Sequence, residues 1–336
     1  MSSRVTLLAL AFLCTIGCGE RRENEYLSER IIISSQDFEA LECLTQKDSL
    51  FSISSDSGKF AFIEDGYICL LQMKEEARPL ILEIRDSLNG EILYKYDSSQ
   101  DKLIMPLFTK NGTNFTIYDN LAHKILNINI NEAINNKNYH PHVFSSNIIS
   151  ERITPWGDRL LFLNPNSYEN ENERVCVSKK NWSVKEGEKQ YNSANVIHGE
   201  LICSPDQASI AYVPYNFNTI ELFNTKQALI KEIALPHETT QGVANAEIGG
   251  EKMYFYMAPL VKCFSSACAG KTLFAAGFID DIDNNYLLIF DWEGKVLKKI
   301  RTKGRIRSLS IDSQDQTIYS WERHEDTDIL FSYRID

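Results

Sequence analysis

The sequence predicts an all-β fold: a six-bladed β-propeller made of four-stranded antiparallel blades. Two observations carry the prediction. A short pattern recurs six times, in which a turn rich in Ser, Asp, Gly or Pro is followed by a basic or small polar residue and then by an apolar and aromatic strand. A further strand follows each of these turns. Repeats of about 40 to 50 residues are typical of propeller blades, in which each repeat forms one small sheet.

The six copies of the pattern set the number of blades. They are residues 55–63, 98–107, 154–163, 204–213, 248–257 and 312–321. Their basic or small polar positions are spaced by about 40 to 65 residues, within or above the range of propeller repeats. The further strands are expected at residues 67–72, 114–119, 174–179, 219–224, 286–291 and 328–333. A turn and another strand follow in residues 221–233 and 289–300, which makes four strands per blade.

The two ends of the chain are expected to meet. The sixth copy stops at Asp336, a few residues after its third strand, and so lacks an outer strand of its own. Residues 30–35 (RIIISS) precede the first blade and have no evident partner. We therefore expect this N-terminal strand to complete the last blade and close the ring, which leaves only short, protected sheet edges. The alternative, a pair of stacked β-sandwiches, would not require the termini to meet.

The first residues have the layout of an export signal. Arg4 gives a positive start, residues 5–16 carry no charge, and a Gly-Cys pair ends the apolar run. The run is too short to span a bilayer as a helix, which needs about 20 residues, and its layout fits a secretory signal peptide. Residues 15–18 (TIGC) resemble the lipobox of bacterial lipoproteins, in which the cysteine is lipidated and becomes the new N-terminus.

This resemblance implies three segments. They are a lipoprotein signal peptide at residues 1–17, a lipidated tether at residues 18–29 that starts with Cys18, and the propeller at residues 30–336. Gly19 stands where Asp tends to hold lipoproteins at the inner membrane, so the resemblance favours the outer membrane of a bacterial cell envelope, facing the periplasm or the surface. The alternative is an uncleaved signal anchor.

The blade spacing, the leader and the C-terminal stretches at residues 285–300, 306–321 and 328–335 resemble the TolB-like six-bladed propeller lipoproteins of Bacteroides-type bacteria. The resemblance covers most of the chain after the leader and rests on a pattern of turns and strands. It implies a fold and a location rather than an activity.

The composition limits which partners the protein is expected to bind and which disulfides it is expected to form. The formal charge of −11 argues against a nucleic-acid partner, because phosphates would be repelled. An exported protein meets an oxidising compartment, in which disulfides are permitted. Cys263 and Cys268 are the one local pair whose spacing could close a small loop, and they are the candidate disulfide. The other cysteines after the leader are expected to be small buried hydrophobic residues.

No sequence motif for catalysis is present. The chain has no H-E-x-x-H, G-x-S-x-G or C-x-x-C motif and no Gly-rich phosphate loop, which removes the commonest enzyme classes that motifs reveal. We predict no catalytic residue, no metal and no cofactor. Long loops at residues 129–147, 164–173 and 258–281 are expected on one shared face. The candidate residues of this binding face are His140, His142, Tyr168, His237 and His324.

Two functions remain open. The first is a membrane-anchored, non-catalytic binding or scaffold protein whose loop face contacts a protein, peptide or glycan. The alternative is a propeller hydrolase or lyase that acts on a sugar or lactone at the central channel. Because propellers host both, the fold does not decide. Convergent carboxylates or histidines around a metal at the channel would favour the enzyme, and a mixed polar or apolar groove would favour binding.

Overall fold

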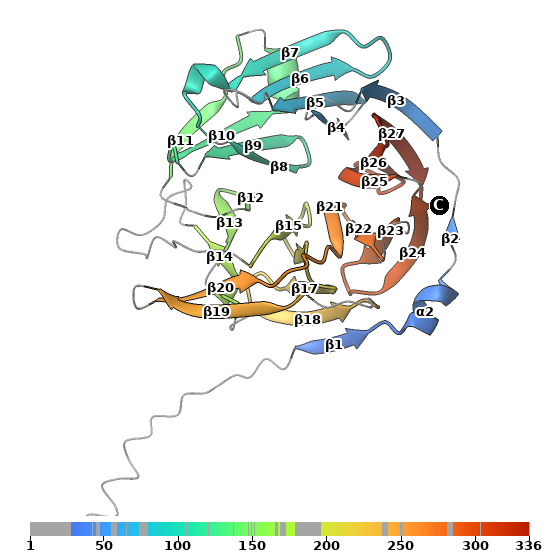
Figure 1. Cartoon of the computed structure of the whole chain (residues 1–336). Coiled ribbons are helices and arrows are strands. Elements are labelled where there is room, and N and C mark those ends of the chain that lie inside the picture. Colours follow the sequence, from blue (N-terminus) through green and yellow to red (C-terminus); the bar gives the residue numbers. More distant parts are fainter. Residues whose placement is uncertain are drawn as a thin grey trace, which may run out of the picture.

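Six antiparallel sheets stand around a central axis as the blades of a propeller (Figure 1). The computed structural model describes residues 28–335 except for residues 42, 45–47, 55–58, 65, 74–79, 105, 120, 137, 147, 149, 151, 165–166, 169–172, 179–195, 237–240, 249–250, 281–284 and 303. The all-β, six-bladed architecture that the sequence predicts is confirmed. Within the described residues, no helix has the length and apolar character needed to cross a bilayer.

The first three blades follow one another along the chain. Blade 1 contains, from the axis outward, β4 (Lys59–Glu64), β5 (Tyr67–Met73), β6 (Leu80–Asp86) and β7 (Ile92–Asp97). Blade 2 contains β8 (Leu107–Asn111), β9 (Asn114–Asp119), β10 (Lys124–Asn129) and β11 (His142–Ser145), with the short helix α3 (Ile130–Asn135) between its last two strands. Blade 3 contains three described strands, β12 (Ile153–Trp156), β13 (Arg159–Leu163) and β14 (Val175–Val177).

The other three blades complete the ring and receive strands from the N-terminal part of the chain. Blade 4 contains β15 (Gly199–Cys203), β16 (Ile210–Pro214), β17 (Thr219–Phe223) and β18 (Leu229–Ala234). Blade 5 contains β21 (Phe264–Ala269), β22 (Leu273–Ile279), β23 (Asn285–Asp291) and β24 (Val296–Thr302). Blade 6 contains β25 (Arg305–Ile311), β26 (Thr317–His324), β27 (Thr327–Arg334) and β3 (Asp48–Ser54).

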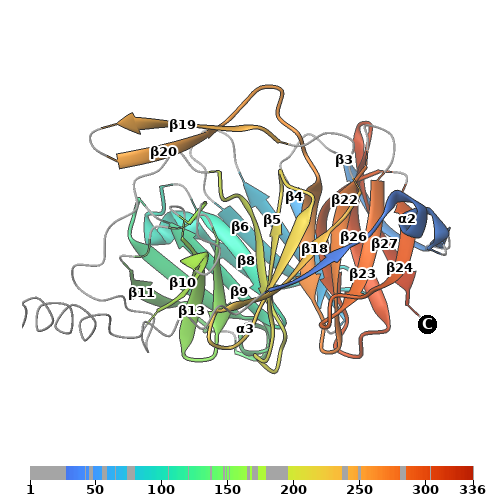
Figure 2. The same ribbon diagram turned by 90° about the horizontal axis from the view of Figure 1, so that it is seen from below.

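The ring has two distinct faces. All six inner strands (β4, β8, β12, β15, β21 and β25) run in the same direction, because each blade starts at the axis and alternates outward. We call the face on which the inner strands begin the start face and the opposite one the end face. Turns between second and third strands lie on the start face, and those between third and fourth strands lie on the end face. The hairpin of β19 (Val243–Ile248) and β20 (Glu251–Tyr256) projects from the start face, whereas α3 lies on the end face (Figure 2).

The core lies between neighbouring blades. Strands in the middle of a blade are covered on both sides, so they appear in the sequence as apolar runs without alternation. All five residues of β16 are buried, for example. One cluster joins blades 1 and 2 around Leu71, Leu82 and Phe115, and another joins blades 4 and 5 around Phe264 and Phe290. The blades are therefore held together by sheet-on-sheet packing of large apolar side chains.

An N-terminal strand closes the ring, as expected, but it is a different strand from the one predicted. β3 pairs antiparallel with β27 and completes blade 6. The expectation that residues 30–35 would do so is wrong: β1 (Glu29–Ile32) pairs in parallel with β18 at the outer edge of blade 4, and α2 (Ser35–Ala40) follows it. A parallel edge pairing needs no hairpin turn, so no turn signal marks it in the sequence.

The N-terminal segment passes around the outside of blades 4, 5 and 6 (Figure 1). After α2, the two-residue strand β2 (Cys43–Leu44) pairs in parallel with β24 of blade 5. Phe38 of α2 is buried against Phe278 and Tyr286, with ring centroids 5.6 and 5.4 Å away. Lys299 Nζ donates a hydrogen bond to the Phe38 carbonyl at 2.6 Å and lies over the Phe38 ring. These contacts fasten the segment to the propeller.

The repeat gave the right number of blades although its copies are not equivalent. Residues 55–63 and 98–107 lead into the inner strands β4 and β8, whereas residues 204–213 and 312–321 lead into the second strands β16 and β26. Residues 248–257 form no part of a blade, since they belong to the separate β19–β20 hairpin. The first hairpin of blade 5 is β21–β22, inside the stretch expected as a loop at residues 258–281. Turn chemistry is the same in all of these hairpins, so it does not reveal which strands they join.

Candidate functional site

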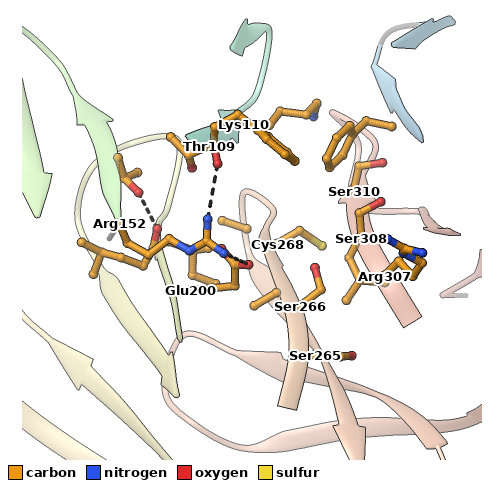
Figure 3. Close-up of a pocket in the computed structure, with 18 of the residues that line it drawn as sticks. Thr109, Lys110, Arg152, Glu200, Ser265, Ser266, Cys268, Arg307, Ser308 and Ser310 are labelled. Carbon is orange, nitrogen blue, oxygen red and sulfur yellow. Dashed lines mark hydrogen bonds and ion pairs between the residues drawn. The ribbon is translucent and has the colours of Figure 1, made fainter. Parts of the chain in front are cut away.

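A cavity of about 350 Å³ follows the propeller axis and receives residues from all six inner strands (Figure 3). Its lining is mixed. Buried serines and apolar side chains lie along the strands, and charged side chains gather toward the two ends. The charged residues among the described lining are Glu64, Lys110, Arg152, Glu200, Lys262 and Arg307. What the cavity can bind depends on which of these charged side chains are paired with a counter-charge.

The end-face part of the cavity carries a closed ion pair. Glu64 is the last residue of β4, and its carboxylate accepts a hydrogen bond from Lys110 Nζ near the end of β8. Both side chains are nearly buried, with exposed fractions of 7 % and 9 %. The pair links the inner strands of blades 1 and 2, and each charge is compensated by the other.

A second charge pair lies on the start-face side. Arg152, just before β12, donates a hydrogen bond to Glu200 at 3.1 Å and another to the Tyr215 hydroxyl, which itself donates to Glu200. Burial alone would lower the pKa of Arg152, but the Glu200 carboxylate raises it well above its ordinary value. Burial also raises the pKa of Tyr215. This trio is a charge-balanced structural network between blades 3 and 4.

Beside it lies a second cavity of about 340 Å³ whose described lining is basic: Lys262, Ser265, Arg305, Ile306, Arg307 and Arg323. Arg323 forms a two-bond ion pair with the buried Asp328, one bond measuring 3.0 Å. Arg307 is 3.9 Å from the same carboxylate. Lys262 and Arg305 are exposed. The two cavities share Lys262, Ser265 and Arg307, so the basic cavity opens into the central one.

The basic side chains repel one another. Burial lowers the pKa of Lys262, and the neighbouring Arg305 lowers it further. The pKa of Arg307 is lowered by burial, and the charges of Arg323 and Arg305 add to this against the opposing effect of Asp328. We call Lys262, Arg305 and Arg307, together with Ser265, the basic mouth.

Two β-bulges build the basic mouth. The pairing of β21 with β22 skips Ser265, and the pairing of β25 with β26 skips Arg307. β21 and β25 are neighbouring inner strands, and the bulges occur near the start of both. A bulge turns one side chain out of the regular alternation of a strand, and such bulges are common next to binding sites. Here they direct a hydroxyl and a guanidinium to the same cavity.

The candidate residues of the predicted binding face do not lie together. His140, on the connection between β10 and β11, and His142, the first residue of β11, are exposed at the end face, so the expectation that they share a face with the others is wrong. His324 ends β26 on the start face, where its Nε2 lies 3.2 Å from the buried carboxylate of Glu322. His237 and Cys18 lie outside the described residues.

Tyr168 lies on the start face but has a packing role. Its ring lies 4.8 Å from that of Tyr254 on β20 and 6.3 Å from that of Phe217, measured between centroids. The neighbouring Tyr256 donates a hydrogen bond to the Val196 carbonyl at 2.7 Å. These aromatic contacts hold the β19–β20 hairpin against blades 3 and 4.

The candidate disulfide between Cys263 and Cys268 is wrong. Both are free, buried cysteines, and β21 runs in extended form from Phe264 to Ala269 between and beyond them. A strand rises about 3.3 Å per residue, which separates two positions five residues apart far beyond the reach of a disulfide. Burial raises the pKa of the Cys263 thiol to about 12, so it remains protonated.

The sequence analysis did not identify the basic mouth. Its residues come from two blades and are separated by about forty positions. One local signal was present: Arg305 and Arg307 stand two residues apart at the start of an inner strand, and the first three positions of the other described inner strands carry at most one charged residue. Among the described residues, no group of three or more His, Cys, Asp or Glu side chains is placed to hold a metal ion.

Comparison with known proteins gives no function. No protein-family model matches the chain, and no curated protein matches it. Among solved structures, a crystal structure of RRP9 WD40 repeats is similar with a TM-score of 0.45 at 10% sequence identity, and the match covers 88% of this chain and 99% of that one. The function has to be argued from the site itself.

Proposed function

We propose that this protein is a lipid-anchored, non-catalytic binding protein that holds its ligand on the start face, at the opening of the central cavity. The observation that carries the proposal is the basic mouth, which shares Lys262, Ser265 and Arg307 with the lining of the central cavity and brings three cations together there. Rigid inner strands present these side chains, and such strands are a better platform for a binding site than free loops.

The cavity lining favours binding over turnover. A hydrolase or lyase needs a general acid or base that is free to exchange protons near neutral pH. The two lining carboxylates, Glu64 and Glu200, are each held by a cation. Burial raises the pKa of the Tyr215 hydroxyl, so this group stays protonated near neutral pH and cannot accept a proton. No histidine belongs to the described lining of the central cavity.

The leader supports attachment to a membrane. Lipidation of Cys18 would leave a polar tether ahead of β1 and hold the propeller at the surface of the cell envelope, with the outer membrane favoured by Gly19. In this proposal the chain is a TolB-like lipoprotein, and its partner is a protein, peptide or glycan that reaches the start face.

Two measurements test the proposal. Lipid labelling and detergent-phase partitioning of the full chain should show an anchored protein, and Cys18→Ala should abolish both. Glycan and peptide arrays should identify a ligand that Arg305→Ala weakens and that is recovered chemically unchanged. Lys226→Ala, in the β17–β18 turn on the end face, is the matched control and should leave binding intact. A ligand that is consumed, or one that depends on the end face, would contradict the proposal.

A further inference from the structure

The central cavity contains a buried hydroxyl that the described part of the protein leaves without a partner. Ser266, on the inner strand β21, is 6 % exposed and belongs to the cavity lining (Figure 3). Other hydroxyls of the lining are bonded: Ser310 Oγ accepts a hydrogen bond from the Ile63 amide at 3.3 Å, and Thr154 donates to the Leu201 carbonyl at 2.5 Å. Among the residues that the structure describes, none is bonded to the Ser266 hydroxyl. Because buried polar groups have partners as a rule, this hydroxyl is expected to bond to a molecule inside the cavity.

The two carboxylates of the lining are each bonded through one oxygen. Glu64 Oε2 accepts from Lys110 Nζ, and Glu200 Oε1 accepts from both Arg152 and Tyr215. The second oxygens, Glu64 Oε1 and Glu200 Oε2, have no hydrogen-bond partner within the described ranges of the chain. An ammonium has three N–H donors, and the described bonds of Lys110 use one of them. The cavity therefore offers acceptors toward both of its ends and donors beside Glu64.

The rest of the cavity suits a neutral ligand with an apolar side. Each of the two carboxylates has its own cation, so an extra charge between these ion pairs would lose its hydration and meet charges of both signs. The aromatic side chains of Phe62 and Phe108 also belong to the lining and lie edge to face, with ring centroids 5.8 Å apart. Pockets for small molecules combine such apolar surface with a few placed polar groups.

We propose that the central cavity binds a neutral, polyhydroxylated ligand: a short chain of sugar units that lies along the propeller axis between Glu64 and Glu200, with one hydroxyl bonded to Ser266. This inference rests on the proposed binding function and selects the glycan among the partners named there. The ligand enters from the start face, where the basic mouth shares lining residues with the cavity. The cavity volume of about 350 Å³ lies in the range of pockets that hold small ligands.

Sugar hydroxyls match the free groups of the cavity because each hydroxyl both donates and accepts a hydrogen bond. The second oxygens of Glu64 and Glu200 need donors, whereas the Lys110 ammonium needs an acceptor. The C–H face of a sugar ring can pack on Phe62 and Phe108 while its hydroxyls reach the polar groups. A peptide fits less well, because its amide N–H only donates and its carbonyl only accepts, so each has to meet the right group at a fixed spacing.

Calorimetric titration of the full chain with four neutral disaccharides, namely cellobiose, maltose, lactose and mannobiose, tests the cavity. At least one should bind with a dissociation constant of about 1 mM or tighter. The neutral peptide N-acetyl-Gly-Ser-Gly-amide is the comparison probe and should bind at least about tenfold more weakly than the best disaccharide. Ser266→Ala should weaken that disaccharide about three- to tenfold, because one hydrogen bond is lost. Its melting temperature should not fall, since no bond within the described protein is removed.

Ser320→Ala is the matched control. Ser320 Oγ is likewise buried and has no partner in the described part of the chain, but it lies on β26, outside the described lining of both cavities. This variant should bind the disaccharide like wild type. The inference is overturned if none of the four disaccharides binds at about 10 mM, if the peptide binds as tightly as the best of them, or if Ser266→Ala binds it as tightly as Ser320→Ala does.

Two results separate this inference from the proposed function. If the arrays identify a peptide that Arg305→Ala weakens while no disaccharide binds, the sugar site is wrong and the binding function stands. If a disaccharide binds in a way that depends on Ser266 and is cleaved to monosaccharides, the sugar site stands and the non-catalytic function is wrong.

Discussion

The two ends of the central cavity handle charge in opposite ways. At the end face, Lys110 and Glu64 are nearly buried and form a pair that satisfies both charges. At the start face, Lys262, Arg305 and Arg307 line a second cavity, and the buried Asp328 forms ion pairs with both Arg323 and Arg307. Both ends are built on the same inner strands. The difference teaches that a lysine or arginine in a propeller channel is not in itself a sign of a binding site.

The two ends of the cavity differ in how far their charged side chains are balanced by counter-charges within the protein. A buried charge that meets its counter-charge within the protein contributes to the fold, and removing its partner is costly. A cluster of like charges repels itself and weakens the fold slightly, so a gain from binding is a physical reason to keep it. Three predictions follow the comparison from the buried pair to the exposed cluster.

The largest effect is expected at the closed pair. Lys110→Met leaves the Glu64 carboxylate buried without a partner, and we expect the free energy of unfolding to fall by about 3 to 5 kcal/mol in urea denaturation. The double variant Glu64→Gln/Lys110→Met removes both charges and should recover most of that loss. A loss below about 1 kcal/mol in the single variant would show that the pair is not needed for folding.

An intermediate effect is expected behind the basic mouth. Gly277→Ala places a methyl group 2.6 Å from Ser265 Oγ, so we expect a loss of about 1 to 3 kcal/mol in stability, measured by urea denaturation, as the bulge is displaced. Gly242→Ala is the control, because its added methyl group would meet only the flexible Met257 side chain. If Gly277→Ala is no less stable than Gly242→Ala, the close packing behind the bulge does not hold it in place.

The smallest effect on stability is expected at Lys262 of the basic mouth. Burial and Arg305 lower the pKa of Lys262 in the folded state, so the folded protein holds this proton less tightly than the unfolded chain does. The charge therefore costs stability at neutral pH, and the cost disappears as the pH rises past the ordinary lysine value of 10.5. Lys262→Met should raise the free energy of unfolding at pH 7 by up to about 0.5 kcal/mol.

Urea denaturation of wild type and Lys262→Met at neutral and alkaline pH measures this difference. The gain should shrink at alkaline pH and at high salt, because both conditions remove the repulsion between Lys262 and Arg305. Lys226→Met should show no such gain. A variant that is less stable than wild type at pH 7 would mean that Lys262 has a compensating partner and that the basic mouth carries less excess charge than we infer.

The number of blades could be predicted from the sequence because it depends on periodicity, which turns and apolar strands both record. Closure by an N-terminal strand could also be predicted, since the last blade lacked a strand. The identity of that strand could not. Residues 30–35 and 48–54 both have the composition of strands, and only the paths around blades 4 and 5 decide that β3 reaches β27 while β1 stops at β18.

The site was harder to predict for a related reason. Histidines in expected loops are candidate site residues in a sequence, yet His140 and His142 lie on the end face, because they follow α3 where the chain leads into β11, the fourth strand of its blade. Lys262 and Arg307 look like ordinary surface residues until two β-bulges bring Arg307 and Ser265 to one cavity. A bulge adds one residue to a strand without changing its composition, so the sequence gives no direct sign of it.

The most direct test of this account is to locate a bound oxyanion. Crystals of the full chain grown with arsenate, a close mimic of phosphate, can be measured at the arsenic absorption edge so that the anomalous signal marks the ion. We expect a peak within hydrogen-bond distance of Arg307 and Ser265, on the start face, and none beside Lys110. A peak elsewhere on the molecule, or no peak at the basic mouth, would contradict the claim that the basic mouth is a binding site.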